Sequence, residues 1–124
     1  MGFLKHSNTL KITAILMAIY TLNSCKEKQE ECNTPSEVTY TKQIAALVEQ
    51  ECFLCHAEDV YKKKASRNKI FDYPSLKKMG ESGQLIGSLT HARGFIPMPY
   101  RKKTKIDSCS IELFKKWVDS GMPE

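Results

Sequence analysis

Apolar residues recur at helical spacing in several short stretches of the chain, and no alternating strand pattern of useful length is found. Along residues 41–51, Ile44, Ala45, Leu47 and Val48 form one apolar face. This spacing predicts a first helix that runs directly into the residues from Cys52 onward.

The closing helix is the best defined of the predicted elements. Asp107 or Ser108 is expected to cap its first turn, and Gly121 is expected to end it. Its apolar face consists of Ile111, Phe114, Trp117 and Val118. We expect this face to pack against the first helix, near the candidate site described below.

Shorter helices are expected between these two. Asp72 and Pro74 mark a helix start, and that helix should end by Gly80 or Gly83. Residues 84–91 predict another short helix. Residues 57–69 are polar and basic, which is typical of a loop with a short helical turn. The fold class is therefore expected to be all-α.

Composition limits the classes of protein that fit. The chain has 124 residues, of which 41% are hydrophobic and 27% charged, with a net charge of +5. These values favour one globular domain and exclude a disordered, collagen-like, coiled-coil or multi-pass membrane protein. A core this small is marginal by itself. The five cysteines are an odd number, so they cannot all be paired within the chain.

The first residues read as a targeting segment. Basic residues precede an apolar run at 12–22, as in a secretory signal peptide, and the run is short for a membrane span. The sequence Leu22-Asn23-Ser24-Cys25 then resembles the lipobox of bacterial lipoproteins, which implies cleavage before Cys25 and acylation of that residue. An uncleaved anchor and plain secretion are the alternatives.

Three segments are expected from this pattern. Residues 1–24 are the signal peptide, residues 25–39 a charged, flexible tether, and residues 40–124 the domain, with folded structure starting between Cys32 and Tyr40. Removing residues 1–24 takes away two lysines and no acid, so the net charge falls to about +3. The expected location is outside the cytoplasm, at a membrane, facing the periplasm or the cell exterior. An oxidising compartment of this kind permits disulfides.

One motif carries chemistry: Cys52-Phe53-Leu54-Cys55-His56. The pattern C-x-x-C-H is the signature of covalent attachment of c-type haem. Residues three apart share a helix face, so both thiols can reach the vinyl groups of one porphyrin. His56 can then bind the iron as the proximal ligand.

Three other readings of these cysteines are open. A thioredoxin-like site would need a preceding strand and a βαβ context. A zinc site would need two further ligands, which Cys109, His91 or Cys32 could supply. The third alternative is a buried disulfide or a pair of thiols.

A second iron ligand is expected downstream, in Phe95-Ile96-Pro97-Met98-Pro99. Two prolines bracket Met98 and restrict the backbone, which fixes where the thioether points. Methionine opposite histidine raises the reduction potential and suits electron transfer. His91, Met79, Met122 and an open site are the alternatives.

Together these features resemble a small bacterial monohaem class I cytochrome c domain, of the lipoprotein type found in Bacteroidetes-like bacteria. The resemblance rests on C-x-x-C-H at 52–56, on Phe95-Ile96-Pro97-Met98-Pro99, and on the closing helix with Phe114 and Trp117. It implies short helices wrapped around one covalently bound haem c, with Cys52 and Cys55 as thioethers, His56 proximal and Met98 distal. It also implies that the first and last helices pack together, which makes a Cys32–Cys109 disulfide reasonable; two separate thiols are the alternative.

The implied function is electron transfer: an exported, lipid-anchored carrier of single electrons, and not an enzyme. The alternatives are a cytochrome subunit of a larger oxidoreductase, or an open-site haem enzyme or ligand sensor. Two basic clusters, Lys62-Lys63-Lys64 and Arg101, Lys102, Lys103 with Lys105, fit a solvated surface; alternatively, the second cluster follows the Met98 loop, rims the haem edge and steers an acidic redox partner. Nucleic acid is not an expected partner, and the sequence does not fix the oligomeric state.

Overall fold

A computed structural model describes residues 31–124, and within that range the chain is helical without strands. A single π-helical turn, η2 (Tyr40–Ile44), leads into α2 (Ala45–His56). The other helices are α3 (Tyr61–Lys64), α4 (Tyr73–Glu81), α5 (Gln84–Leu89) and α6 (Ser108–Asp119). The all-α prediction is confirmed.

The helices begin where short polar side chains satisfy the amide groups of the first turn. Such groups have no partner within the helix and need an acceptor from elsewhere. Three side chains accept them: Thr39 from the amide of Lys42 at 3.2 Å, Asp72 from that of Ser75 at 3.0 Å, and Asp107 from that of Ser110 at 2.8 Å. The expected starts of the middle and closing helices are therefore correct.

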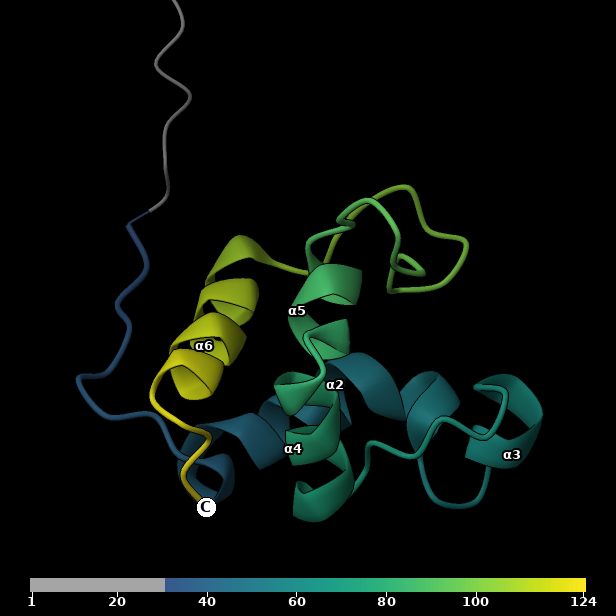
Figure 1. Cartoon of the computed structure of the whole chain (residues 1–124), viewed down its shortest axis with the longest axis horizontal. Helices are drawn as coiled ribbons and strands as arrows, with labels where there is room; N and C mark the ends of the chain where they lie inside the picture. The colour runs from purple at the N-terminus through teal and green to yellow at the C-terminus, as the bar shows by residue number, and fades with distance from the viewer. Residues whose placement is uncertain (1–30) are drawn as a thin grey trace, which may run out of the picture.

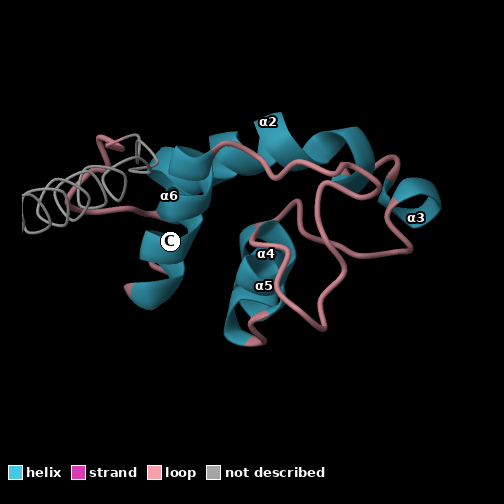
Figure 2. Cartoon of the chain, turned by 90° about the horizontal axis from the view of Figure 1, so that it is seen from above, coloured by secondary structure: helices cyan, strands magenta, loops and turns pink. Residues whose placement is uncertain are grey.

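One cluster of buried side chains forms the core, and Cys52 and Phe53 of the motif pack against it. Its largest fully buried side chains are Trp117, Phe114, Ile44, Leu76 and Val48. Burying a side chain of this kind stabilises the fold by about 1.5–3 kcal/mol. In Figures 1 and 2, α6 and α3 lie at opposite ends of the structure, with α2 between them.

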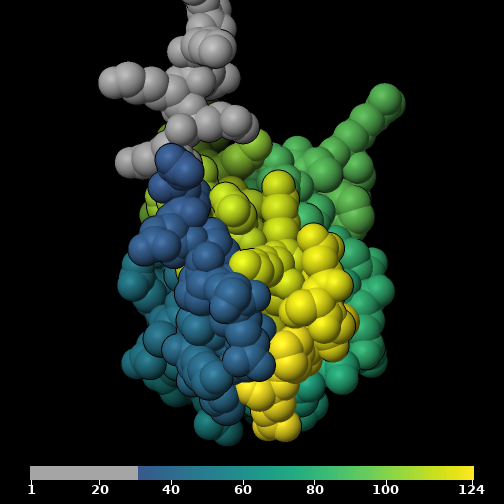
Figure 3. Space-filling view, turned by 90° about the vertical axis from the view of Figure 1, so that its left-hand side faces the viewer, coloured from purple at the N-terminus to yellow at the C-terminus, as the bar shows by residue number. Residues whose placement is uncertain are grey.

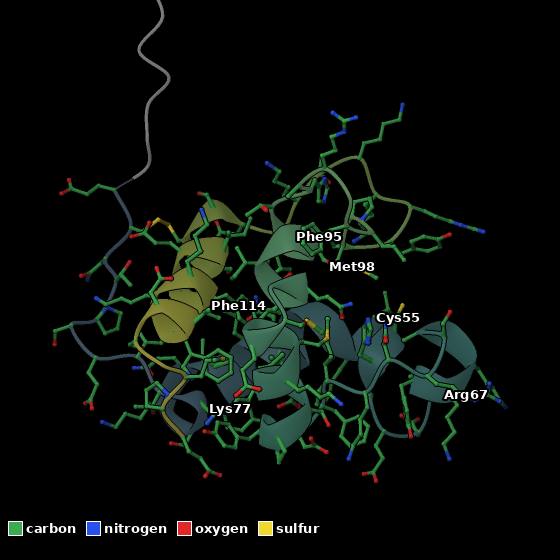
Figure 4. The ribbon with its side chains drawn as sticks, viewed as in Figure 1. Cys55, Arg67, Lys77, Phe95, Met98 and Phe114 are labelled. Carbon is green, nitrogen blue, oxygen red and sulfur yellow. A yellow bond between two sulfur atoms is a disulfide. The ribbon has the colours of Figure 1, made fainter. Side chains whose placement is uncertain are left out.

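The apolar face of α6 packs against η2 and α5, at the beginning of the first helical segment. The expected packing of α6 against the first helical segment is confirmed at η2, and Cys52 and Phe53 of the motif pack against the same core cluster as Phe114 and Trp117. The motif occupies the other end of α2, and Figure 4 places Phe114 of α6 well away from Cys55.

The last residues of the chain bind the start of the first helix. The amides of Tyr40 and Thr41 donate to the carbonyls of Pro123 and Glu124, at 2.9 and 3.3 Å. The indole of Trp117 also donates to Pro123, at 2.9 Å. Figure 3 shows the two segments side by side, the early residues in blue and the last ones in yellow. The rings of Tyr40, Tyr73 and Trp117 pack at the same place.

The residues before Tyr40 are already attached to the helical domain. Cys32 forms a disulfide with Cys109, which lies in the first turn of α6, and their Cα atoms are 5.3 Å apart. Val38 is only 2% exposed and belongs to the core. The tether expected at residues 25–39 is therefore anchored from Cys32 onward.

Two targeting predictions, the signal peptide and acylated Cys25, fall outside the described residues. Among the helices of residues 31–124, none is both long enough and apolar enough to cross a membrane.

Candidate functional site

His56 lies in the last turn of α2 and is 8% exposed. Its Nδ1 is 3.0 Å from the backbone carbonyl oxygen of Asn68. A carbonyl only accepts, so Nδ1 carries the proton and donates it. In the neutral ring this leaves the lone pair on Nε2, which is the state of a metal-binding imidazole.

The thiols of Cys52 and Cys55 are unpaired, half-buried, and three residues apart on α2. They therefore lie on one side of the helix, one turn apart. Burial, assisted by the carboxylate of Glu51, raises the pKa of the Cys52 thiol to about 12. Without a bound metal ion, Cys52 is thus a neutral thiol at neutral pH, with little thiolate to attack a disulfide.

The structure also bears on the residues named for a zinc site. The sulfurs of Cys32 and Cys109 are bonded to each other. The Nε2 of His91 donates to the carbonyl of Met98, at 2.9 Å. Nowhere in residues 31–124 do three or more histidine, cysteine or acidic side chains form a group able to hold a metal ion. The three residues proposed as extra zinc ligands therefore have other partners.

Met98 lies in the loop between α5 and α6, and its backbone is held on both sides. Its amide donates to the carbonyl of Ser88 at 3.0 Å, and its own carbonyl accepts from the ring of His91. Figure 4 shows Met98 on this loop above Cys55, at the same end of the molecule. The loop is thus fixed to the end of α5, with Met98 on the side of the motif.

The two methionines named as alternative iron ligands, Met79 and Met122, both pack against other parts of the domain. Met79 packs partly buried against the core. Met122 is 8% exposed, and its sulfur lies so close to Gly80 that an added Cβ there would be 2.5 Å away. Both methionines therefore fill space between helices, as adaptable core side chains do.

Phe95 is a site residue whose role the sequence did not reveal. Its ring lies on the backbone of Gly87 in α5, where an added Cβ would be 2.5 Å from the ring. Glycine within a helix costs stability, which signals a close approach. Phe95 thus anchors the loop of Met98 to α5.

Four large apolar side chains of the described residues remain exposed. Leu54 lies within the motif, whereas Phe95, Ile96 and Tyr100 flank Met98. Their exposed fractions are 74% for Leu54, 38% for Phe95, 60% for Ile96 and 60% for Tyr100. All four lie within a few residues of a candidate haem ligand, so the apolar surface left in water is concentrated at the site.

A shallow cavity of about 430 Å³ opens beside α4. Its lining residues are Asn68, Lys69, Ser75, Lys78, Met79, Ser82 and Gln84. None of the residues predicted to bind haem lines it. It adjoins the site through Asn68, whose carbonyl holds His56.

No protein-family model, curated protein or solved structure matches the chain. What the site does must therefore be inferred from its own residues.

Proposed function

We propose that the chain is an exported, lipid-anchored monohaem cytochrome c that carries single electrons between redox partners. The observation that carries the proposal is the hydrogen bond from Nδ1 of His56 to the carbonyl of Asn68. It orients the imidazole and leaves Nε2 available, as an axial haem ligand requires.

Other residues of the site fit a covalently bound haem. Cys52 and Cys55 offer unpaired thiols one helical turn apart, directly before His56. The exposed side chains of Leu54, Phe95 and Ile96 provide apolar surface that a porphyrin would cover. Burial of that surface would add to a small core, against which Cys52 and Phe53 already pack.

The chain's own residues have three tasks in this proposal. Cys52 and Cys55 would hold the haem through thioethers, and His56 and Met98 would supply the imidazole and thioether ligands of its iron. The haem supplies the one-electron chemistry, in which the iron alternates between its ferric and ferrous states. The two hydrogen bonds to the Met98 backbone restrict the movement of this loop. The thioether would therefore move little when the iron gains or loses an electron.

Attachment of haem is tested by expressing the chain together with a c-type haem maturation system. A pyridine haemochrome spectrum of the denatured protein should show a thioether-linked haem that remains with the polypeptide. The variant Cys52→Ser/Cys55→Ser should lose it. Cys32→Ser/Cys109→Ser is the matched control, because it also removes two sulfurs but leaves the motif intact. A wild-type protein without linked haem would refute the proposal.

The distal ligand is tested by the weak long-wavelength band of ferric iron bound to sulfur. Met98→Ala should abolish this band and lower the reduction potential, whereas Met79→Ala should leave both unchanged. A high-spin ferric spectrum in the unmodified protein would instead favour an open site, as in a haem enzyme or sensor.

The lipid anchor is tested separately. Mass spectrometry of the mature N-terminus should find an acylated Cys25 after loss of residues 1–24. Cys25→Ser should move the protein from the membrane to the soluble fraction, without changing its haem content.

A further inference from the structure

The charges of the described residues are unevenly distributed along the chain. Residues 61–69 and 92–106 together carry ten lysines and arginines and no acid. The rest of residues 31–124 carries five lysines and twelve acidic residues. The basic residues of the two segments are Lys62, Lys63, Lys64, Arg67, Lys69, Arg93, Arg101, Lys102, Lys103 and Lys105. Basic residues are thus concentrated in two segments of the domain.

The two basic segments lie beside the candidate site, where the exposed acidic residues Glu58 and Asp59 follow the end of α2. In Figure 4, Arg67 lies to one side of Cys55 and Met98 to the other, so the two basic segments flank the end of α2. All ten basic side chains belong to exposed residues, and within residues 31–124 only Lys69 among them has an ion pair, with Asp72.

Exposed apolar side chains lie within the same surface. Ile96 and Tyr100 are each 60% exposed, and Leu54 is 74% exposed. The guanidinium of Arg101 lies over the ring of Tyr100, 5.3 Å from its centre. An apolar centre with a charged rim is the usual composition of a protein-binding patch.

We propose that this basic face, residues 61–69 and 92–106 around the end of α2, docks the acidic surface of a redox-partner protein. The proposal rests on the function proposed above, because it identifies the partner at the same site. Opposite charges would steer the partner to the site, and the exposed apolar residues would make the close contact.

A protein surface fits this face better than an anionic bilayer does. Segments that lie in a bilayer surface are commonly amphipathic helices of several turns. Here α3 has four residues and no buried ones, and the rest of the face is loop. The cations also come from two segments on either side of the motif, so carboxylates of one partner could bind both.

The docking face is tested first by lysine footprinting, which does not depend on electron transfer. The protein is acetylated at low salt with and without poly-L-glutamate, and each lysine is quantified by mass spectrometry. We expect protection of Lys62, Lys63, Lys64, Lys102, Lys103 and Lys105, and little at Lys42, Lys77 and Lys115. Equal protection of all lysines would overturn the proposal, since only net charge would then matter.

A second arm replaces poly-L-glutamate with vesicles of phosphatidylethanolamine and phosphatidylglycerol, using the chain with Cys25→Ser. We expect weaker protection of the same lysines by the vesicles. If the vesicles protect them and poly-L-glutamate does not, the face binds lipid and the proposal is wrong.

A kinetic arm measures electron transfer from the reduced protein to ferricyanide, which accepts one electron and becomes ferrocyanide. We expect the rate constant to fall as salt rises, and Lys102→Gln/Lys103→Gln to lower it several-fold at low salt. Lys42→Gln/Lys115→Gln, with the same change in net charge, should have little effect. Equal effects of the two variants would overturn the proposal. A failure of the proposed function would instead show as absent haem, with the lysine footprint still measurable.

Discussion

The two ends of this domain differ in what covers their apolar side chains. At the α6 end, Trp117 and Phe114 are both 0% exposed, and the last residues of the chain close over the start of the first helix. At the α3 end, Leu54 is 74% exposed and Ile96 60% exposed. The difference lies in how completely the chain buries its own large apolar side chains, which is full for Trp117 and Phe114 and small for Leu54 and Ile96. The α3 end also carries the motif residues Cys52, Cys55 and His56.

The largest effect is expected from Trp117→Ala, which would break the packed end. The side chain is fully buried, contacts two tyrosine rings and donates to Pro123. Truncating a buried aromatic residue costs about 3–5 kcal/mol. Urea unfolding monitored by circular dichroism measures this loss. As a control, Leu54→Ala at the open end should change the stability of the haem-free chain by less than about 0.5 kcal/mol. Similar losses in both variants would contradict the comparison.

The next effect concerns the disulfide that attaches residue 32 to α6. The bond joins residues 77 apart in sequence, so it restricts the unfolded chain strongly. Removing it by Cys32→Ser/Cys109→Ser should cost about 2–5 kcal/mol. The same loss should follow from reducing the wild type, and unchanged urea midpoints in either experiment would show that the bond contributes nothing.

A smaller effect is expected at the start of α4, between the two ends. Asp72 caps this helix and pairs with Lys69, with its Oδ2 2.5 Å from Nζ. Asp72→Ala should cost about 1 kcal/mol, whereas Asp72→Asn keeps a good cap and loses only the ion pair. If both variants are equally destabilised, the cap is not the source of the stability.

The same residue gives a pH dependence. Burial alone would raise the pKa of Asp72, but the hydrogen bonds from Lys69 and Ser75 outweigh it and hold the pKa below its ordinary value. A carboxylate with a depressed pKa stabilises the fold above the pKa of the unfolded chain, about 3.9. This contribution is lost as the pH falls below that value and through the lower pKa of the folded state. Urea midpoints of Asp72→Asn should therefore approach those of the wild type at acid pH.

The smallest effect on stability, and the sharpest on the site, is expected from Gly87→Ala. The added methyl group would meet the ring of Phe95 and displace the loop that carries Met98. The long-wavelength sulfur band of the ferric protein should weaken, with a change in unfolding free energy within about 1 kcal/mol. Gly87→Ala/Phe95→Leu shortens the clashing side chain but keeps an apolar anchor, so an equally weak band in the double variant would contradict this explanation.

Local signals in the sequence predicted the helices well. Asp72 with Pro74, and Asp107 with Gly121, marked helix ends that the structure reproduces. These signals act within a few residues, so they can be read along the chain. The motif formed by Cys52, Cys55 and His56 was also recognised from residues that are close together in the sequence.

Contacts between residues far apart in the sequence could not be predicted from these local signals. The bonds from His56 to Asn68 and from His91 to Met98 depend on how loops return to helices. Likewise, the spacing of Phe114 and Trp117 predicted an apolar face on α6 and its packing on the first helical segment, but not its packing on α5. The helix periodicity identifies a face that must be buried, and many partners could bury it.

The bonds between the amides of Tyr40 and Thr41 and the carbonyls of Pro123 and Glu124 also set an order of events during synthesis. The packed end joins the beginning of the domain to its last residues, so it cannot close on a nascent chain that lacks α6. Cooperative folding of this end therefore requires that residues up to Glu124 have been made. Until then Cys52 and Cys55 stay on an open polypeptide, accessible to any machinery that modifies thiols before folding.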